Sequence, residues 1–387
     1  MRIAYFIKRP LSDRDFKRYG IEYFLEKGHE IVVIDLSETI HPRLSNSSRS
    51  TYNSDRVKII QVASWANFEK CESTLNECNL VFLLIQSYGL SVNILRPLRM
   101  IGRLKTPYII IGPSKIPFWY QKREAGRWLD KICDRIKHMN LWNSAISRIP
   151  PRFLSLPYAN YAVSTCSESL LNNSLVGAET KLVPCHTYDY ELYLKKKEFT
   201  WTGEKKILFI DQDYPYAQDF KTLGYEVDAE NYFRLINVAF DQIERVLKMP
   251  VVIAVHPRAD YNDKRRPFGD RKLVYDDTVE QIAQSELVLG HTSTALGIAV
   301  AFNKPIVILA SRVLYNISES QRAMYDGIAK YTGNTIKFID ETDKLDLKDA
   351  FEINNLKYNE FIEMFMRDKA SLEEPYWDII SNNLEIR

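Results

Sequence analysis

Residues 287–302 read LVLGHTSTALGIAVAF, and this stretch decides the fold of the C-terminal half. An apolar run is followed by His-Thr-Ser-Thr and then by a helical pattern. Residues 251–258, VVIAVHPR, show the same change from an apolar run to polar residues. Apolar strands that alternate with helices predict a parallel sheet covered on both faces. In such a sheet, ligands bind at the carboxyl ends of the strands.

The same alternation runs along the whole chain of 387 residues. It predicts an α/β protein with two Rossmann-like domains. Strands are expected at 2–7, 30–35, 57–63, 80–85, 108–111, 161–165, 181–185, 207–210, 251–255, 273–275, 287–289 and 305–309. Long helices are expected at 13–27 and 230–247, with Asp228 as a helix cap. We place the N-terminal domain at 1–195 and the C-terminal domain at 200–355, with the polar, charged stretch 186–200 as the candidate linker between them. At 356–387 we expect helices that cross back to the first domain.

Composition excludes several classes of protein. The net charge of +2 does not indicate a nucleic-acid partner. Five cysteines without a C-x-x-C pair favour a reducing cytoplasm over a disulfide framework or a zinc site. No apolar stretch approaches the length of a membrane span, and the N-terminus is typical of a first strand rather than a signal peptide.

The segment 114–150 of the first domain is an insertion of different composition. Residues 115–148 carry eight Lys and Arg against three Asp and Glu, a local balance of 8 − 3 = +5, with interleaved aromatic residues. Such a segment suits peripheral contact with the inner face of the cytoplasmic membrane, or with a lipid-linked acceptor. The alternative is a solvated helical insertion whose aromatic side chains pack on the domain.

The strongest candidate site lies at the ends of the two strands quoted above. A helix N-terminus offers unpaired N–H groups and a positive dipole end to a phosphate, and hydroxyl side chains add donors. His256 and Arg258 supply donors from the other strand end. The alternative for the second motif is a plain helix cap. The residues predicted to bind the donor phosphate are His256, Pro257, Arg258, His291, Thr292, Ser293 and Thr294.

These motifs, with Asn303-Lys304-Pro305-Ile306, resemble bacterial GT-B glycosyltransferases that use CMP-activated sugars, among them sialyltransferases, polysialyltransferases and Kdo transferases. Residues 9–20 (RPLS and DFKRYG) and 209–233 (FIDQ, YP, DF and YF) are most similar to the retaining β-Kdo transferases of capsule and O-antigen assembly. The resemblance covers most of 1–35 and 205–310. It implies two domains that face a cleft, and transfer of Kdo from CMP-β-Kdo to a growing polysaccharide or glycolipid. It further implies that His256 and Ser293-Thr294 hold the CMP phosphate, that Glu280 meets the ribose, and that no metal is required. The alternative for Glu280 is a solvated carboxylate on a helix.

A catalytic carboxylate is expected in the loop 211–228, because glycosyl transfer needs a base or a nucleophile. The resemblance implies an Asp nucleophile and retention. Asp219 is the first candidate, then Asp228, then Asp211. Asp228 as a helix cap and Asp211 as a loop brace are the structural alternatives. Asp211-Gln212-Asp213 is also a spacing that binds a divalent ion.

Three functions remain open from the sequence. The first is the CMP-Kdo transferase. The second is a related enzyme: another CMP-nonulosonate transferase, acting with sialic or pseudaminic acid, or a glycerophosphotransferase of teichoic-acid type. The third is a partner of an assembly complex that binds glycan or nucleotide without turnover.

Overall fold

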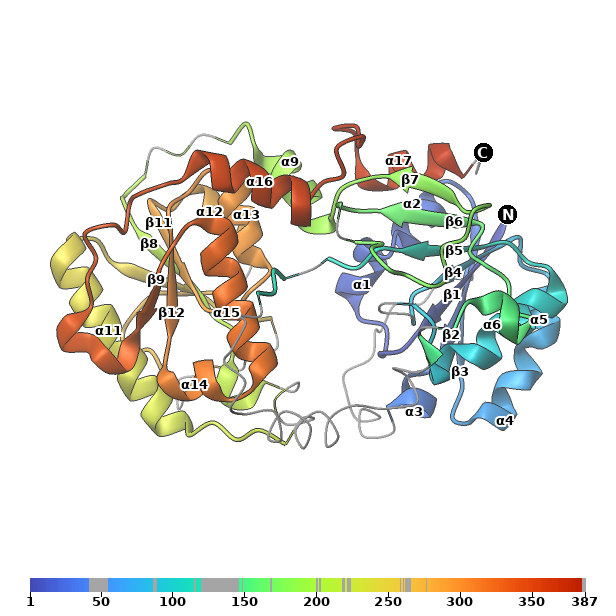
Figure 1. The fold of residues 1–387 in the computed structure, drawn as a ribbon, viewed down its shortest axis with the longest axis horizontal. Helices are drawn as coiled ribbons and strands as arrows, with labels where there is room; N and C mark the ends of the chain where they lie inside the picture. Colours follow the sequence, from blue (N-terminus) through green and yellow to red (C-terminus); the bar gives the residue numbers. More distant parts are fainter. Residues whose placement is uncertain are drawn as a thin grey trace. The chain divides into compact units, whose positions relative to one another are not determined.

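The computed structural model describes residues 1–41, 55–85, 89–114, 116–119, 146–147, 149–167, 169–199, 201, 203–217, 220, 224–257, 259, 261, 266–275 and 277–384, with the backbone only at 342–344. The chain divides into two compact units (Figure 1). The first comprises Met1–Pro113, Glu124–His186 and Asp368–Arg387, and the second comprises Ser114–Arg123 and Thr187–Arg367. No helix in the described part of the chain is long and apolar enough to cross a bilayer.

The first unit is built on a parallel sheet of seven strands in the order β3-β2-β1-β4-β5-β6-β7. The strands are β1 (Arg2–Ile7), β2 (Glu30–Asp35), β3 (Val57–Gln61), β4 (Leu80–Leu83), β5 (Tyr108–Ile111), β6 (Tyr161–Ser164) and β7 (Lys181–Pro184). The helices are α1 (Asp13–Arg18), α2 (Ile21–Glu26), α3 (Ser37–Ile40), α4 (Trp65–Phe68), α5 (Glu72–Asn76), α6 (Val92–Leu104) and α17 (Tyr376–Asn383). Alternate side chains of β1 pack on opposite faces of the sheet, against α1, α2 and α17 on one face and against α4, α5 and α6 on the other.

The sequence predicts one helix at 13–27, and the structure divides it at Gly20. Gly20 has a φ of 70°, and a Cβ there would lie 2.5 Å from the ring of Trp377. The phenol of Tyr23 donates to Asp378 at 2.6 Å. The break therefore seats α17, a helix from the other end of the chain, on the first sheet.

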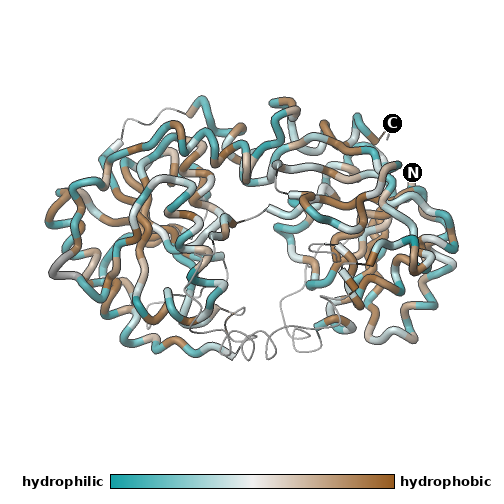
Figure 2. Tube along the Cα trace, viewed as in Figure 1, coloured by the Kyte–Doolittle hydropathy of each residue, from teal (hydrophilic) through white to brown (hydrophobic). Residues whose placement is uncertain are grey.

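The second unit is built on a parallel sheet of six strands in the order β10-β9-β8-β11-β12-β13. The strands are β8 (Ile207–Ile210), β9 (Val251–Ala254), β10 (Leu273–Val274), β11 (Leu287–Gly290), β12 (Ile306–Ala310) and β13 (Ile336–Phe338). The helices are α9 (Tyr188–Lys196), α11 (Ala229–Leu247), α12 (Thr278–Ala283), α13 (Ala295–Ala301), α14 (Arg312–Asn316), α15 (Glu319–Thr332) and α16 (Asn355–Phe365). Helix α11 covers one face, while α12, α13, α15 and α16 cover the other. Figure 2 shows the hydrophobic residues concentrated along the strands of each sheet.

Helix α9 occupies most of the stretch that the sequence presents as a charged linker. Thr187 caps it by accepting from the N–H of Tyr190 at 3.2 Å. The ring of Tyr190 is buried among the apolar side chains of α12 and α13, while Lys195 pairs with Glu191 at 3.0 Å. The cap from Thr187 and the buried ring of Tyr190 therefore make this polar segment a helix that packs on the second unit.

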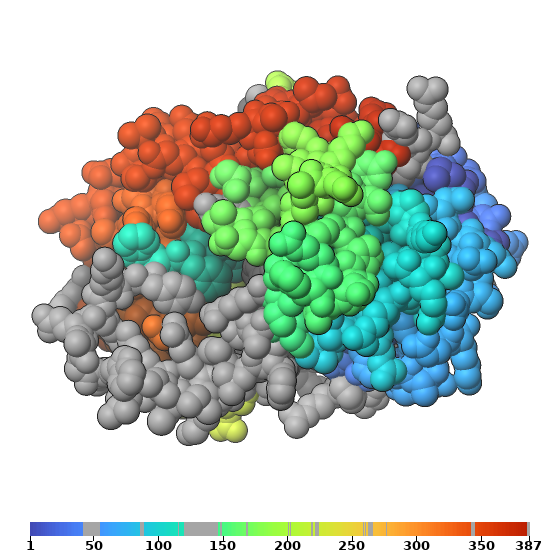
Figure 3. All heavy atoms as spheres, turned by 45° about the vertical axis from the view of Figure 1, so that its right-hand side comes forward, coloured from blue at the N-terminus to red at the C-terminus, as the bar shows by residue number. Residues whose placement is uncertain are grey.

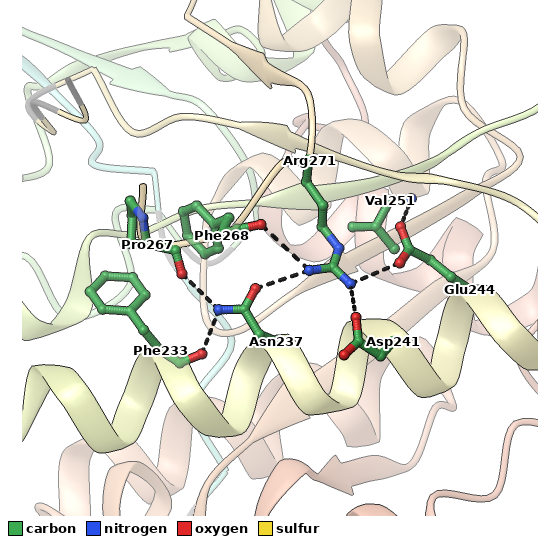
Figure 4. A network of polar contacts seen from close by, with 8 residues as sticks. All are labelled: Phe233, Asn237, Asp241, Glu244, Val251, Pro267, Phe268 and Arg271. Carbon is green, nitrogen blue, oxygen red and sulfur yellow. Dashed lines mark hydrogen bonds and ion pairs between the residues drawn. The ribbon is translucent and has the colours of Figure 1, made fainter. Parts of the chain in front are cut away.

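Arg271 ties the amino end of the second sheet to α11 (Figure 4). Its guanidinium donates to Asp241, to Glu244 at 2.8 Å and to Asn237 at 3.0 Å. Glu244 also accepts from the N–H of Val251, the first residue of β9, at 2.8 Å. Only 12% of the Arg271 side chain is exposed, so these charge-assisted bonds hold strand and helix in register.

Candidate functional site

Three loops with candidate residues meet at the carboxyl edge of the second sheet. They hold residues 211–213 after β8, 256–257 after β9 and 291–294 after β11. Strand β8 lies between β9 and β11, so the three loops are neighbours. Two contacts link them: the N–H of His256 donates to Asp211 at 3.3 Å, and the N–H of Thr292 donates to Gln212 at 2.8 Å. The structure therefore brings together the two strand-end motifs that the sequence singles out.

Asp211 braces the loop after β8. Its side chain is buried and accepts from the N–H of Asp213 at 2.9 Å and from the phenol of Tyr261 at 3.0 Å, in addition to His256. Burial raises the pKa of this carboxyl to about 6, against the opposing effect of these donors. The Tyr261 phenol also lies 3.2 Å from Asp213. Because a phenol has one proton, the two carboxyls share this one donor.

Asp213 has a left-handed backbone, with a φ of 48°. A residue with a β-carbon is uncommon in this region, although Asp tolerates it better than most. The bond from its N–H to Asp211 fixes this turn, and the turn places Gln212 so that its amide oxygen reaches Thr292. The sequence does not single out Gln212 as a site residue.

His291 lies in the interior of the unit, with no exposed surface. Its Nδ1 is 2.6 Å from the carbonyl oxygen of Leu309, so this nitrogen carries the proton. Its Nε2 therefore accepts from the phenol of Tyr232 at 2.9 Å. Burial lowers the pKa of the ring to about 4, so the imidazole is neutral near pH 7. In this arrangement His291 joins β11, β12 and α11, and its binding role stays a prediction.

Thr292 is also buried, next to a second polar cluster. Its hydroxyl lies 2.5 Å from the phenol of Tyr214, and Gln321 on α15 donates to both oxygens, at 3.1 and 2.9 Å. The hydroxyl of Thr292 therefore holds the loop after β11 in place through these hydrogen bonds. Neither Tyr214 nor Gln321 is predicted as a partner from the sequence.

Ser293 and Thr294 are the members of the motif that reach the surface. Ser293 is half-buried, and its hydroxyl accepts from the N–H of Ala295 at 3.2 Å. Thr294 is exposed and precedes α13. Both residues line a small cavity in the second unit. Its other polar lining residues are Ser114, Thr187 and Asp189.

The remaining candidates lie in the loop after β9, on α12 and at the start of α11. His256 is half-buried and Pro257 is exposed at the end of β9. Glu280 accepts from Lys196 of α9 and from Gln284, both at 2.9 Å. Asp228 caps α11 by accepting from the N–H of Asn231 at 3.1 Å, as the sequence predicts.

Two candidates lie outside the described residues, namely Arg258 and the first catalytic choice, Asp219. The same holds for 120–145, the greater part of the basic segment. Where the structure describes the chain, it places no group of three or more His, Cys, Asp or Glu side chains suited to a metal ion.

No protein-family model matches the chain, and no curated protein sequence does either. Solved structures do resemble it. A histidine variant of the wall teichoic acid polymerase TagF matches with a TM-score of 0.54 and 10% identity, over 99% of this chain and 89% of that chain. A second TagF variant, soaked with CDPG, matches with a TM-score of 0.50 and 11% identity, over 100% and 89%. MurG from Acinetobacter baumannii matches with a TM-score of 0.51 and 9% identity, over 100% and 99%.

At these identities the likeness concerns the fold. Matches that span nearly the whole of both chains confirm the prediction of two Rossmann-like domains of the GT-B class.

Proposed function

We propose that the chain is a GT-B glycosyltransferase that acts on a growing bacterial polysaccharide or glycolipid and takes its donor group from an activated nucleotide. The observation that carries the proposal is the meeting of three polar loops at the carboxyl edge of the second sheet. Ligands of doubly wound sheets bind at this edge. The similarity in fold to MurG and to TagF, which is named as a wall teichoic acid polymerase, supports the same class.

Within this site, His256, Ser293 and Thr294 are the groups that we assign to the donor phosphate. Their side chains lie at two strand ends that Asp211 and Gln212 join. His291 and Thr292 are buried behind them, and we assign to both the task of holding the loop. Sites that are preorganised before the ligand binds often have one set of residues that contacts the ligand and a second set that supports the first.

For the donor we propose CMP-β-Kdo, on the sequence resemblance, without a metal or other cofactor. In a retaining transfer, a carboxylate attacks the anomeric carbon while the bond to the CMP phosphate breaks and CMP leaves. The acceptor hydroxyl then attacks the same carbon and displaces the carboxylate, and its proton passes to the solvent. Asp219 stays our first candidate, because Asp211 and Asp228 each have a bracing or capping role that accounts for them.

A second candidate is transfer of a glycerophosphate group. It is favoured by the similarity to the wall teichoic acid polymerase, including the variant soaked with CDPG. The two proposals share a cytidine nucleotide and differ in the group that is transferred.

The test is a thermal-shift screen with CMP, CDP, UDP and GDP, followed by product analysis with CMP-Kdo and with CDP-glycerol. Stabilisation by CMP and transfer from CMP-Kdo are expected. Transfer from CDP-glycerol alone selects the second candidate. Stabilisation without transfer from either donor indicates a non-catalytic partner, and no response to any nucleotide contradicts the proposed class.

A further inference from the structure

The segment 116–119, which follows β5 in the chain, packs against α15 of the second unit (Figure 3, teal atoms beside orange and red ones). The N–H of Trp119 donates to the carbonyl oxygen of Ala323 at 2.9 Å. The side chain of Ile116 packs against the apolar cluster that includes Leu296 and Ile328. From the sequence alone, this segment belongs to an insertion of the N-terminal domain.

Gly327 makes this packing possible. A Cβ at position 327 would lie 2.2 Å from the carbonyl oxygen of Pro117 and 2.8 Å from the nitrogen of Phe118. Both are backbone atoms, which cannot rotate away as the end of a side chain does. In a helix the Cα–Cβ bond tilts toward the N-terminus, so a side chain at 327 would also crowd the turn that holds the carbonyl of Ala323.

The backbone conformation at position 327 does not itself require a glycine. Gly327 lies in the middle of α15, and its φ is not among the positive values of the chain. A glycine in the interior of a helix is less favourable than alanine by about 0.5–1 kcal/mol. Close approach of the segment 116–119 is the feature of the structure that offsets this cost.

The same segment forms part of the wall of the cavity beside the donor motif. Ile116 and Pro117 line this cavity together with Ser293 and Thr294. Ile328, the residue after Gly327, lines it as well. The contact with α15 therefore fixes a part of the cavity lining that the segment shares with the hydroxyl residues of the motif.

We propose that the segment 116–119 is a positioning element for Ser293 and Thr294, and that Gly327 is the residue that seats it. The loss of CMP affinity that it predicts rests on the function proposed above. The packing of the segment on α15 does not. Position 327 is distant in sequence from the motif and is not itself among the residues that line the cavity. A side chain there acts on the motif only through the segment.

The test compares the wild type with Gly327→Ala. In a helix without the packed segment, this change raises stability by about 0.5–1 kcal/mol. We expect the opposite: a lower melting temperature, and faster hydrogen exchange in the peptides that contain 116–119 and 293–297. We also expect weaker binding of CMP by about tenfold, measured by calorimetry.

Ala329→Gly is the matched control. It makes the reverse change on the same helix, two residues away, and lowers helix propensity without adding an atom near Pro117. It should lower the melting temperature and leave exchange at 293–297 unchanged.

Each other outcome is decisive. A more stable Gly327→Ala protein with unchanged exchange overturns the packing. Faster exchange at 116–119 with unchanged exchange at 293–297 and unchanged CMP affinity overturns the positioning role. If the wild type binds no nucleotide, the proposed function fails, and exchange at 293–297 alone decides the positioning role.

Discussion

The buried carboxyl of Asp211 predicts a pH dependence of stability that can be measured without any ligand. Burial raises its pKa from 3.8 to about 6. Between these values the folded chain keeps a proton that the unfolded chain has lost, so the free energy of unfolding falls as the pH rises. Each unit of pKa corresponds to about 1.4 kcal/mol. The rise from 3.8 to about 6 therefore lowers the free energy of unfolding by about 3 kcal/mol across this pH range.

Asp211→Asn is the perturbation, because an amide keeps the shape of the carboxyl but does not ionise. The quantity to measure is the free energy of unfolding of the wild type minus that of the variant, from urea denaturation followed by circular dichroism. Groups that do not interact with Asp211 titrate alike in both proteins and cancel. The difference should fall by about 3 kcal/mol between about pH 4 and about pH 7. Asp270→Asn, at a side chain that is 97% exposed, controls for the loss of one charge.

The result that would refute the reasoning is a difference that grows as the pH rises. It would mean that the three donors outweigh burial and that Asp211 is ionised in the folded chain. The brace would then be a charged one. The same experiment therefore decides which of the two opposing effects is larger at this carboxyl.

Three further predictions concern the site and the fold. His256→Ala should weaken CMP binding by about 1.5–3 kcal/mol, through the loss of a charge-assisted bond to phosphate; unchanged affinity in calorimetry would remove His256 from the donor site. Asp219→Asn should abolish transfer and spare CMP binding, since an amide is a very poor nucleophile. Full activity in a radiolabelled-donor assay would move the test to Asp228→Asn and then to Asp211→Asn, and full activity of all three variants would move the search to Glu168 or Asp189. Arg271→Ala should lower the free energy of unfolding by about 1.5–3 kcal/mol, because it leaves the partly buried carboxylate of Glu244 without its charged partner. The matched Arg266→Ala, at an exposed ion pair, should change it by less than about 1 kcal/mol in the same urea titration.

The strands could be predicted because each is an apolar run between polar or turn residues. Four of them have the predicted bounds: Arg2–Ile7, Glu30–Asp35, Tyr108–Ile111 and Ile207–Ile210. The helices were harder to predict. The division of the predicted helix at Gly20 depends on Trp377, which lies more than three hundred residues away along the chain. The amphipathic pattern of 13–27 does not reveal this contact. Strand β13 was not predicted, since its three residues are only half-buried.

The site shows the same limit at the level of single side chains. The two motifs at neighbouring strand ends could be found, because the order of apolar run, polar residues and helix is local. Their partners could not. Tyr261 reaches Asp211, Tyr232 reaches His291 and Gln321 reaches Thr292 across 29 to 59 positions of sequence, and such pairings follow from how helices and loops pack on the sheet.

The path of the chain between the two units also has a consequence for protein engineering. The second unit includes Ser114–Arg123 and ends at Arg367, after which Asp368–Arg387 returns to the first unit and supplies α17. A hybrid enzyme with a single crossover near position 200 would inherit the 116–119 segment from one parent and its glycine seat from the other. It would also carry an α17 that is foreign to the sheet beneath it. Exchange of donor specificity between such proteins therefore needs junctions on both sides of each returning segment, so that every piece moves together with the surface on which it packs.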